Sequence, residues 1–237
     1  MKPEDRPKKP RERIIIALDV PSANEAIALA RDLSGEVAFF KIGLQLYTAA
    51  GPEIVRAIAA TGARIFLDLK LHDIPNTVAK AVAAAGELQV AMLTIHLSGG
   101  ARMIAAAVGT ASPDLLLLGV TVLTSSDETT LHETGVSGGV ADQTLRLGQL
   151  GAGAGIRGLV ASPHEVVRLR QSLPGEMRIV TPGVRPTWAA ADDQKRFTTP
   201  REALDNGADY LVIGRPVTAH PRPPEAVRRI IGELEEP

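Results

Sequence analysis

The chain has 237 residues, of which 45% are hydrophobic and 22% are charged, the balance of a soluble globular domain. Lys and Arg number 26 against 27 for Asp and Glu, so a formal net charge of -1 provides no overall attraction to nucleic acid or to an anionic membrane. The absence of cysteine excludes disulfides, thiolate nucleophiles and Cys-ligated metal centres. Chemistry based on carboxylates, amines, Arg and His remains.

The N-terminal segment MKPEDRPKKPRER is charged and rich in proline. It lacks the apolar stretch of a secretory signal and contains acids that a mitochondrial presequence avoids. We therefore expect residues 1–13 to form a flexible, solvated tail. The longest apolar runs, such as the one that begins at Leu115, fall well short of the ~20 residues that span a bilayer. A cytoplasmic protein without a membrane partner is expected.

After this tail, short runs rich in Leu and β-branched residues alternate with longer Ala-rich segments of helical spacing. This alternation is typical of βα units that form a parallel sheet. The runs are apolar throughout, as strands covered on both faces require. The predicted strands are Ile14–Asp19, Val37–Gly43, Arg64–Lys70, Val90–His96, Leu115–Leu123, Ile156–Ser162, Arg178–Gly183 and Asp209–Gly214.

About eight such units in a chain of this length predict an α/β fold, a (β/α)8 TIM barrel that forms one domain over residues 14–237. An open doubly wound sheet is the alternative, but it would place a Gly-rich dinucleotide loop after the first strand. The segment there, DVPSANEA, has no such pattern and offers Ser22 or Asn24 as a helix N-cap. The glycine-rich run Gly151–Gly155 precedes a strand, so we expect a turn.

Charged residues occur at the C-terminal ends of four successive predicted strands, where the loops of a barrel surround its active site. An unpaired ion in an apolar strand costs several kcal/mol, so these acids and amines are expected to neutralise one another. Asp68 and Lys70 are two apart on one strand and should point together into the barrel mouth. The charged positions are Asp19, Lys41, Asp68, Lys70 and Asp73, followed by His96.

An ammonium flanked by carboxylates has its charged form favoured, so Lys70 is expected to donate a proton rather than to form a Schiff base. The alternative is a set of buried salt bridges that only orders the barrel.

A second candidate site lies after the last two strands, where this fold commonly binds phosphate. Strand seven leads to Arg185, and strand eight leads to Gly214 and Arg215, whose guanidinium can add charge-assisted hydrogen bonds. The alternative for Arg215 is an ordinary surface residue.

These segments together resemble the orotidine 5'-phosphate decarboxylase family. The most specific one is FLDLKLHDIPNTV, Phe66–Val78, in which Asp68, Lys70 and Asp73 form the D-x-K-x-x-D signature. The resemblance covers nearly the whole chain after the tail. Its other segments are IALDV, FKIGLQLY, VTVLTS, TPGVRP, DDQKR and VIGRP.

The resemblance implies a decarboxylase that converts orotidine 5'-monophosphate to uridine 5'-monophosphate, the last step of pyrimidine biosynthesis, without cofactor or metal. Lys70 would protonate C6, in a catalytic set with Asp68, Asp73 and Lys41. The segment Arg185–Phe197 is expected to be a lid, with Trp188 packed on the barrel rim.

The resemblance also assigns the remaining substrate contacts. Asp19 and Lys41 would hold the ribose, and Thr124 and Gln194 the pyrimidine. The phosphate would contact Arg185, Gly214, Arg215 and Gln194, with Pro182 also at the substrate. Family members of this kind are homodimers, in which Asp73, Ile74 and Thr77 reach the neighbouring active site.

Three other interpretations remain. A keto-gulonate phosphate decarboxylase shares D-x-K-x-x-D but would use Asp73 as a metal ligand. A ribulose-phosphate epimerase could take ligands from Asp19, Asp68 and His96, although Lys41 and Lys70 would repel the metal. A catalytically dead barrel would be expected to lack Lys70 or Asp68. No histidine is expected to be catalytic. His96 is expected to be a hydrogen-bonded core residue and His72 to orient its loop, and no function is assigned to His132, His164 or His220.

Overall fold

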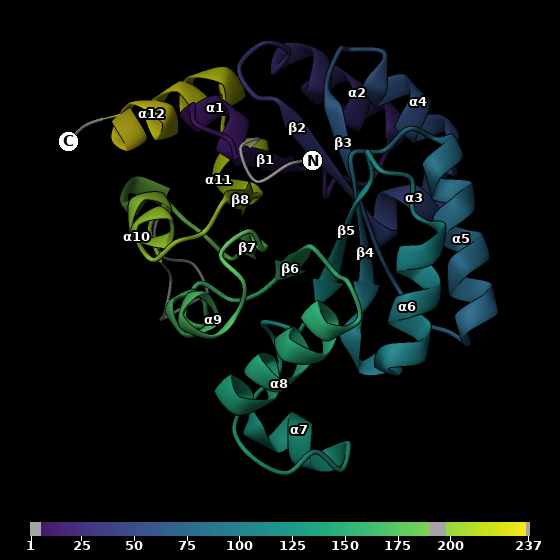
Figure 1. Ribbon diagram of the computed structural model, residues 1–237. Helices are drawn as coiled ribbons and strands as arrows, with labels where there is room; N and C mark the ends of the chain where they lie inside the picture. Colours follow the sequence, from purple (N-terminus) through teal and green to yellow (C-terminus); the bar gives the residue numbers. More distant parts are fainter. Residues whose placement is uncertain (1–5, 190–197, 236–237) are drawn as a thin grey trace.

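The computed structural model describes residues 6–189 and 198–235 and contains a closed barrel of parallel strands in the order β1 to β8. The predicted TIM barrel is therefore confirmed, and Figure 1 shows the strands at the centre with helices around them. The strands are β1 Ile14–Ala17, β2 Phe39–Gly43, β3 Arg64–Leu71, β4 Met92–His96, β5 Leu116–Val120, β6 Gly158–Val160, β7 Arg178–Pro182 and β8 Tyr210–Ile213.

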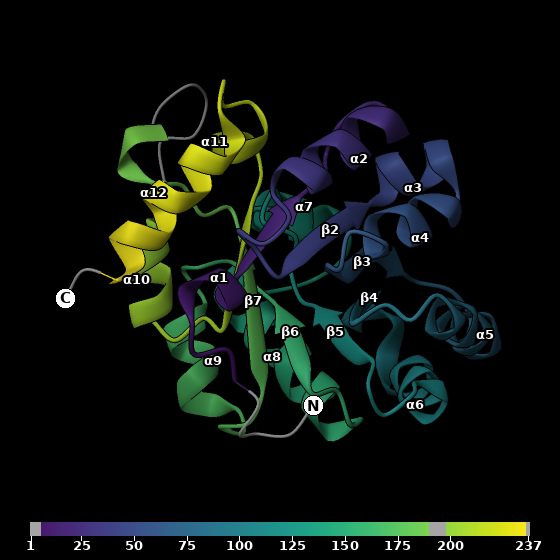
Figure 2. The ribbon, with the colours of Figure 1, turned by 90° about the horizontal axis from the view of Figure 1, so that it is seen from above.

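The helices that follow the strands cover the outer face of the barrel, and α5 and α6 lie side by side in both views (Figures 1 and 2). Four short helices, α1, α3, α7 and α11, were not expected from the sequence. The helices are α1 Pro10–Arg13, α2 Ala23–Asp32, α3 Leu44–Ala50, α4 Glu53–Ala59, α5 Pro75–Glu87, α6 Gly100–Thr110, α7 Glu128–Glu133, α8 Val140–Gly153, α9 Val166–Ser172, α10 Pro200–Asp205, α11 Arg215–Thr218 and α12 Pro223–Glu235, with 3-10 turns at Leu97–Gly99 and Thr187–Ala189.

Apolar side chains pack in two layers, one between strands and helices and one inside the barrel. The inner layer is what makes the barrel a packed core rather than a pore. At its N-terminal end it holds Phe39, Met92 and Tyr210, and towards the C-terminal end it holds Phe66 and Val212. The inner layer therefore separates the two ends of the barrel.

Local signals account for several helix starts. Ser22 is the N-cap of α2 and accepts a hydrogen bond from the backbone N–H of Glu25 at 3.2 Å, while Asn24 lies inside the helix. Thr199 and Glu202 form a capping box at α10. The hydrogen bonds from Thr199 lower the pKa of the Glu202 carboxyl. Trp188 packs against the core, with the Arg229 guanidinium 4.6 Å from its ring centroid, which confirms its expected place on the rim.

Two expectations are corrected. Residues Gly151–Gly153 are not a turn but the last turn of α8, and the chain leaves the helix only at Ala154. A Cβ at Gly151 would meet Leu97 Cδ2 at 2.9 Å, so this glycine allows α8 to pack closely on the strand-four loop.

The predicted tail is also shorter than residues 1–13, because Arg6 and Arg13 hold the chain against the N-terminal end of the barrel. The Arg13 guanidinium donates to the carbonyls of Ala208 at 2.7 Å and Asp209 at 3.2 Å. The carboxylate of Asp209 pairs with Arg6 at 3.3 Å and with Arg170 at 2.5 Å, and it accepts the N–H of Ile179 at 2.8 Å. These contacts around the buried Asp209 anchor α1, which lies beside α12 (Figure 1). No helix in the described ranges is long and apolar enough to cross a membrane.

Candidate active site

A cavity of about 280 Å³ opens at the C-terminal ends of the strands. It brings together side chains from β1, β2 and β3 with the ends of β5, β7 and β8, as expected for an active site on this fold. Seven residues predicted for the site line it: Asp19, Lys41, Asp68, Lys70, Thr124, Pro182 and Gly214. Its other walls are mostly apolar, from Ala17, Phe66, Val120, Val122, Leu123, Val160, Ala161, Gly183 and Val212.

The centre of the cavity is an ion pair between two residues of β3. Lys70 Nζ lies 2.8 Å from both carboxylate oxygens of Asp68. The Asp68 side chain is 12% exposed and that of Lys70 is 29% exposed, so the ammonium faces the cavity while the carboxylate lies beneath it. This contact confirms that the two side chains meet.

The charges continue from β3 to β2 and β1. Lys41 Nζ is 3.7 Å from Asp68 Oδ2 and 2.9 Å from Asp19 Oδ1, so each ammonium neighbours a carboxylate. Gly43 leaves room for this ion pair, because a Cβ at this position would lie 3.0 Å from Lys41 Nζ and 3.3 Å from Asp19 Oδ1. The expected chain of alternating charges is present from Asp19 to Lys70.

The Asp68–Lys70 contact depends on an irregular backbone at Lys70 and not on the alternation of side chains in a regular strand. Lys70 has φ of 50°, in the left-handed region, which is uncommon for a residue other than glycine. Pairing with β4 shifts here, since β3 advances from Leu67 to Leu71 while β4 advances only from Leu93 to Ile95. A β-bulge therefore re-aims the lysine at the cavity.

Thr94 on β4 holds this bulge in place. Its hydroxyl accepts the backbone N–H of Lys70 at 2.8 Å and donates to Asp68 Oδ1 at 2.9 Å, and the residue is fully buried. Sequence reasoning missed Thr94. The available signal was a polar side chain in the otherwise apolar strand VAMLTIH, beside the strand that carries the signature.

Two histidines flank the ion pair on the side of α5 and α6. The rings of His72 and His96 have centroids 5.6 Å apart at an interplanar angle of 40°. Burial lowers the pKa of His96, and the neighbouring His72 and Lys70 lower it further. The half-buried His96 is therefore neutral near pH 7. It ends β4, close to the candidate catalytic residues Asp68 and Lys70.

Several predicted site residues do not line this cavity. Asp73, Ile74 and Thr77 are exposed in the loop and first turn after β3, and Ile74 is 66% exposed. Asp73 accepts the N–H of Ile74 at 2.6 Å.

The residues predicted to bind phosphate are only partly assembled. Arg215 is exposed directly after Gly214, and Arg185 donates its backbone N–H to Thr198 at 3.1 Å. Gln194 and most of the predicted lid, Arg185–Phe197, lie outside the described residues.

Comparison with known families gives a match to the model described as "Orotidine 5'-phosphate decarboxylase / HUMPS family", over residues 12–230. The chain belongs to this family. It is 52% identical over 225 residues to orotidine 5'-phosphate decarboxylase of Opitutus terrae, covering 94% of this chain and 98% of that one. It is 48% identical over 230 residues to the enzyme of the same name from Geotalea daltonii, covering 94% and 96%.

A solved structure of the same description gives a similar result. The crystal structure of orotidine 5'-phosphate decarboxylase from Lactobacillus acidophilus is 32% identical and superposes with a TM-score of 0.83, covering 95% of this chain and 100% of that one. The family that the D-x-K-x-x-D segment resembles is therefore confirmed.

Proposed function

We propose that this protein decarboxylates orotidine 5'-monophosphate to uridine 5'-monophosphate without a cofactor, with Lys70 as the proton donor. Family membership supports the reaction. The single observation that supports the role of Lys70 is its ammonium, which is 2.8 Å from both oxygens of Asp68 and faces the cavity. The same proposal describes a cytoplasmic enzyme of pyrimidine biosynthesis.

The reaction needs a cation at the carbon that loses CO2. When the bond from C6 to the carboxylate breaks, the electron pair stays on C6 in an orbital that is not conjugated with the ring. A preorganised ammonium stabilises this developing charge without reorganising at the moment of reaction. The Lys70 N–H bond then breaks, its proton forms the new C6–H bond, and the neutral amine regains a proton from water.

Asp68 has two functions in this proposal. Its carboxylate pairs with the Lys70 ammonium and orients it, and it would lie next to the substrate carboxylate that leaves. Because Lys41 also neighbours Asp68, at 3.7 Å, the carboxylate is shared by two ammonium groups and does not neutralise Lys70 alone. Asp19 pairs with Lys41, so the two carboxylates and two ammonium groups together carry no net charge. Asp19 and Lys41 would bind the ribose hydroxyls.

The remaining substrate contacts follow the order of the loops. Thr124 lines the cavity after β5 and would meet the pyrimidine, together with Gln194. Pro182 and Gly214 line it after β7 and β8, so the phosphate would lie there, with Arg185 and Arg215 supplying charge. Binding energy from this remote phosphate can favour the transition state at C6.

The proposal includes a homodimer in which Asp73, Ile74 and Thr77 enter the neighbouring site. Support comes from exposure: Ile74, Leu44 and Leu123 are 66%, 55% and 39% exposed, and they follow β3, β2 and β5 at the C-terminal end of the barrel. Large apolar side chains gathered at a functional end are typical of an interaction surface.

Ultraviolet absorbance of orotidine 5'-monophosphate with purified protein in excess EDTA tests the reaction. Loss of the orotate band in wild type, and its persistence with Lys70→Ala, is the expected result. The proposal fails if the band persists in wild type while a keto-gulonate phosphate turns over only after Mg2+ is added. That outcome would make Asp73 a metal ligand.

Mixing two inactive variants tests the shared site. In the proposed dimer each active site takes Lys70 from one subunit and Asp73 from the other. A mixed dimer of Asp73→Ala and Lys70→Ala subunits therefore has one site with both residues intact and one site that lacks both. About a quarter of the wild-type activity should return. No recovery, in a preparation whose light scattering shows mixed dimers, would contradict the contribution of Asp73 across the interface.

A further inference from the structure

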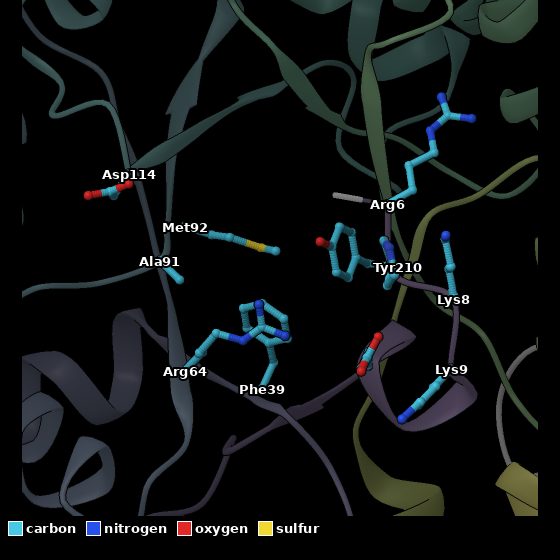
Figure 3. A pocket seen from close by; sticks show the side chains of 11 residues that line it. Arg6, Lys8, Lys9, Phe39, Arg64, Ala91, Met92, Asp114 and Tyr210 are labelled. Carbon is cyan, nitrogen blue, oxygen red and sulfur yellow. The ribbon is translucent and has the colours of Figure 1, made fainter. Parts of the chain in front are cut away.

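A second cavity, larger than the one at the candidate active site, lies at the opposite end of the barrel. Its volume is about 690 Å³, against about 280 Å³ for the active-site cavity, and it falls within the usual range for small-molecule sites. It opens at the N-terminal ends of β2, β3, β4 and β8 (Figure 3). Its lining is Arg6, Pro7, Lys8, Lys9, Glu12, Phe39, Arg64, Ala91, Met92, Asp114 and Tyr210.

The floor of this N-terminal cavity is apolar and rigid. Phe39, Met92 and Tyr210 are at most 1% exposed and belong to the inner barrel core. The rings of Phe39 and Tyr210 meet edge to face, with centroids 5.6 Å apart, and Figure 3 shows Met92 and Tyr210 pointing toward each other across the cavity. Because these side chains are already covered by protein atoms, they close the bottom of the cavity, and the exposed surface on which a ring can stack is the Arg64 guanidinium above them.

One wall presents a planar cation. The Arg64 guanidinium lies over the Phe39 ring, 4.0 Å from its centroid, and the residue is exposed (Figure 3). One face of this guanidinium therefore stacks on protein, while its N–H groups and other face are open to a ligand. An arginine held in this way can stack on a second ring and bind an anion bidentately.

The rim is cationic and poorly neutralised. Arg6 is already paired with Asp209 at 3.3 Å. In the part of the chain that the structure describes, no carboxylate lies within ion-pair distance of Lys8, Lys9 or Arg64. These three cations share the lining with the two carboxylates of Glu12 and Asp114, so the unpaired cations outnumber the acids by one. The local excess of positive charge favours an anion.

We propose that this N-terminal cavity binds an organic phosphate that carries a flat ring, the chemistry of a nucleotide. The ring stacks on the Arg64 guanidinium above the apolar floor, and the phosphates meet Lys8 and Lys9. Burial raises the pKa of the Tyr210 phenol, so this side chain stays neutral at the bottom of the cavity. The cavity and the catalytic cavity lie at opposite ends of the strands, so the two sites are tested separately.

Calorimetric titration of the full chain with ATP, inorganic triphosphate and adenosine tests this assignment. ATP should bind most tightly, since it alone presents both the ring and the charge. Arg64→Met should weaken ATP binding at least about tenfold, because it removes the stacked cation and its charge-assisted bonds. Glu12→Gln should tighten ATP binding, because it removes a negative charge that repels the phosphates of ATP.

Arg215→Met is the matched control, since it removes one arginine from the other end of the barrel. ATP binding should be unchanged in that variant, and decarboxylation should be unchanged in Arg64→Met. The assignment is wrong if ATP produces no binding heat, or if its binding survives Arg64→Met and is lost in Arg215→Met. Equal affinity for triphosphate and ATP would overturn the stacking of the ring.

Discussion

At the C-terminal end of the barrel, charged side chains bind one another: Asp68 contacts Lys70 at 2.8 Å and Lys41 at 3.7 Å. At the N-terminal end, arginines bind instead to backbone carbonyls and to the buried Asp209, as Arg13 and Arg170 do. The larger cavity belongs to the second end. Cavity size alone therefore does not support the choice of the proposed active site, whereas the Lys70 ammonium, paired with a carboxylate and open to the smaller cavity, does.

The largest expected contrast comes from removing one cation from each end. Lys70→Met should lower kcat by more than about 1000-fold, because the proton donor and the charge at C6 are both lost. Arg64→Met should change kcat less than about twofold, since it lies beyond the inner core. Steady-state absorbance assays measure both. Comparable losses in the two variants would break the distinction between the ends.

The next contrast concerns stability. Asp209→Asn should lower the free energy of unfolding by about 3 kcal/mol, because it removes the buried anion that pairs with the partly buried Arg170. The activity of the folded fraction should stay near that of wild type. Asp142→Asn, which breaks the exposed pair with Arg168, should cost less than about 1 kcal/mol. Urea denaturation measures both, and equal costs would contradict the structural role of the Asp209 cluster.

A smaller effect is expected at the support of the ion pair. Thr94→Val should lower kcat by about 10- to 100-fold, because the bulge and the Asp68 carboxylate lose a shared hydrogen bond and shift. Thr94→Ser should recover most of the rate. Thr181→Val is the control, since the Thr181 hydroxyl is fully buried and has no hydrogen-bond partner among the described residues. A merely structural Thr94 would give a stability loss with an unchanged kcat.

The smallest effect is the pH dependence at His96. Its pKa is lowered in the folded protein from the ordinary value of 6.5, so the unfolded chain binds the proton more readily. The contribution of His96 to stability is therefore complete above pH 6.5 and is lost as pH falls toward the folded pKa. Thermal unfolding of His96→Asn should depend less on pH than wild type between about pH 5 and 7.5. A steeper dependence in the variant would reverse this assignment.

The sequence predicted the barrel because each strand is a short apolar run and each helix an amphipathic segment, so local pattern and global fold agree. It also predicted that Asp68 and Lys70 meet, although the reason it used, a regular strand, is incomplete. The left-handed backbone at Lys70 depends on the hydroxyl of Thr94 on another strand. Such pairing between strands leaves no sign in the spacing of one segment.

The N-terminal end was harder to predict. The charged side chains of residues 6–13 were expected to be solvated. Arg6 instead pairs with the Asp209 carboxylate and Arg13 donates to the Ala208 carbonyl, about 200 positions later in the chain. The cavity beside them joins the starts of four strands, and no single motif marks it. Exposed Ile74 and Thr77 were singled out only through the resemblance, whereas Asp73 was also one of the charged positions at the strand ends. The role proposed for all three depends on a second subunit.

A crystal structure with uridine 5'-monophosphate bound is the most direct test of the account. The account predicts that C6 of the pyrimidine faces Lys70 Nζ, with the ribose at Asp19 and the phosphate beside Gly214 and Arg215. A nucleotide seated only over Arg64 at the N-terminal end, or one whose phosphate contacts Lys70, would contradict it.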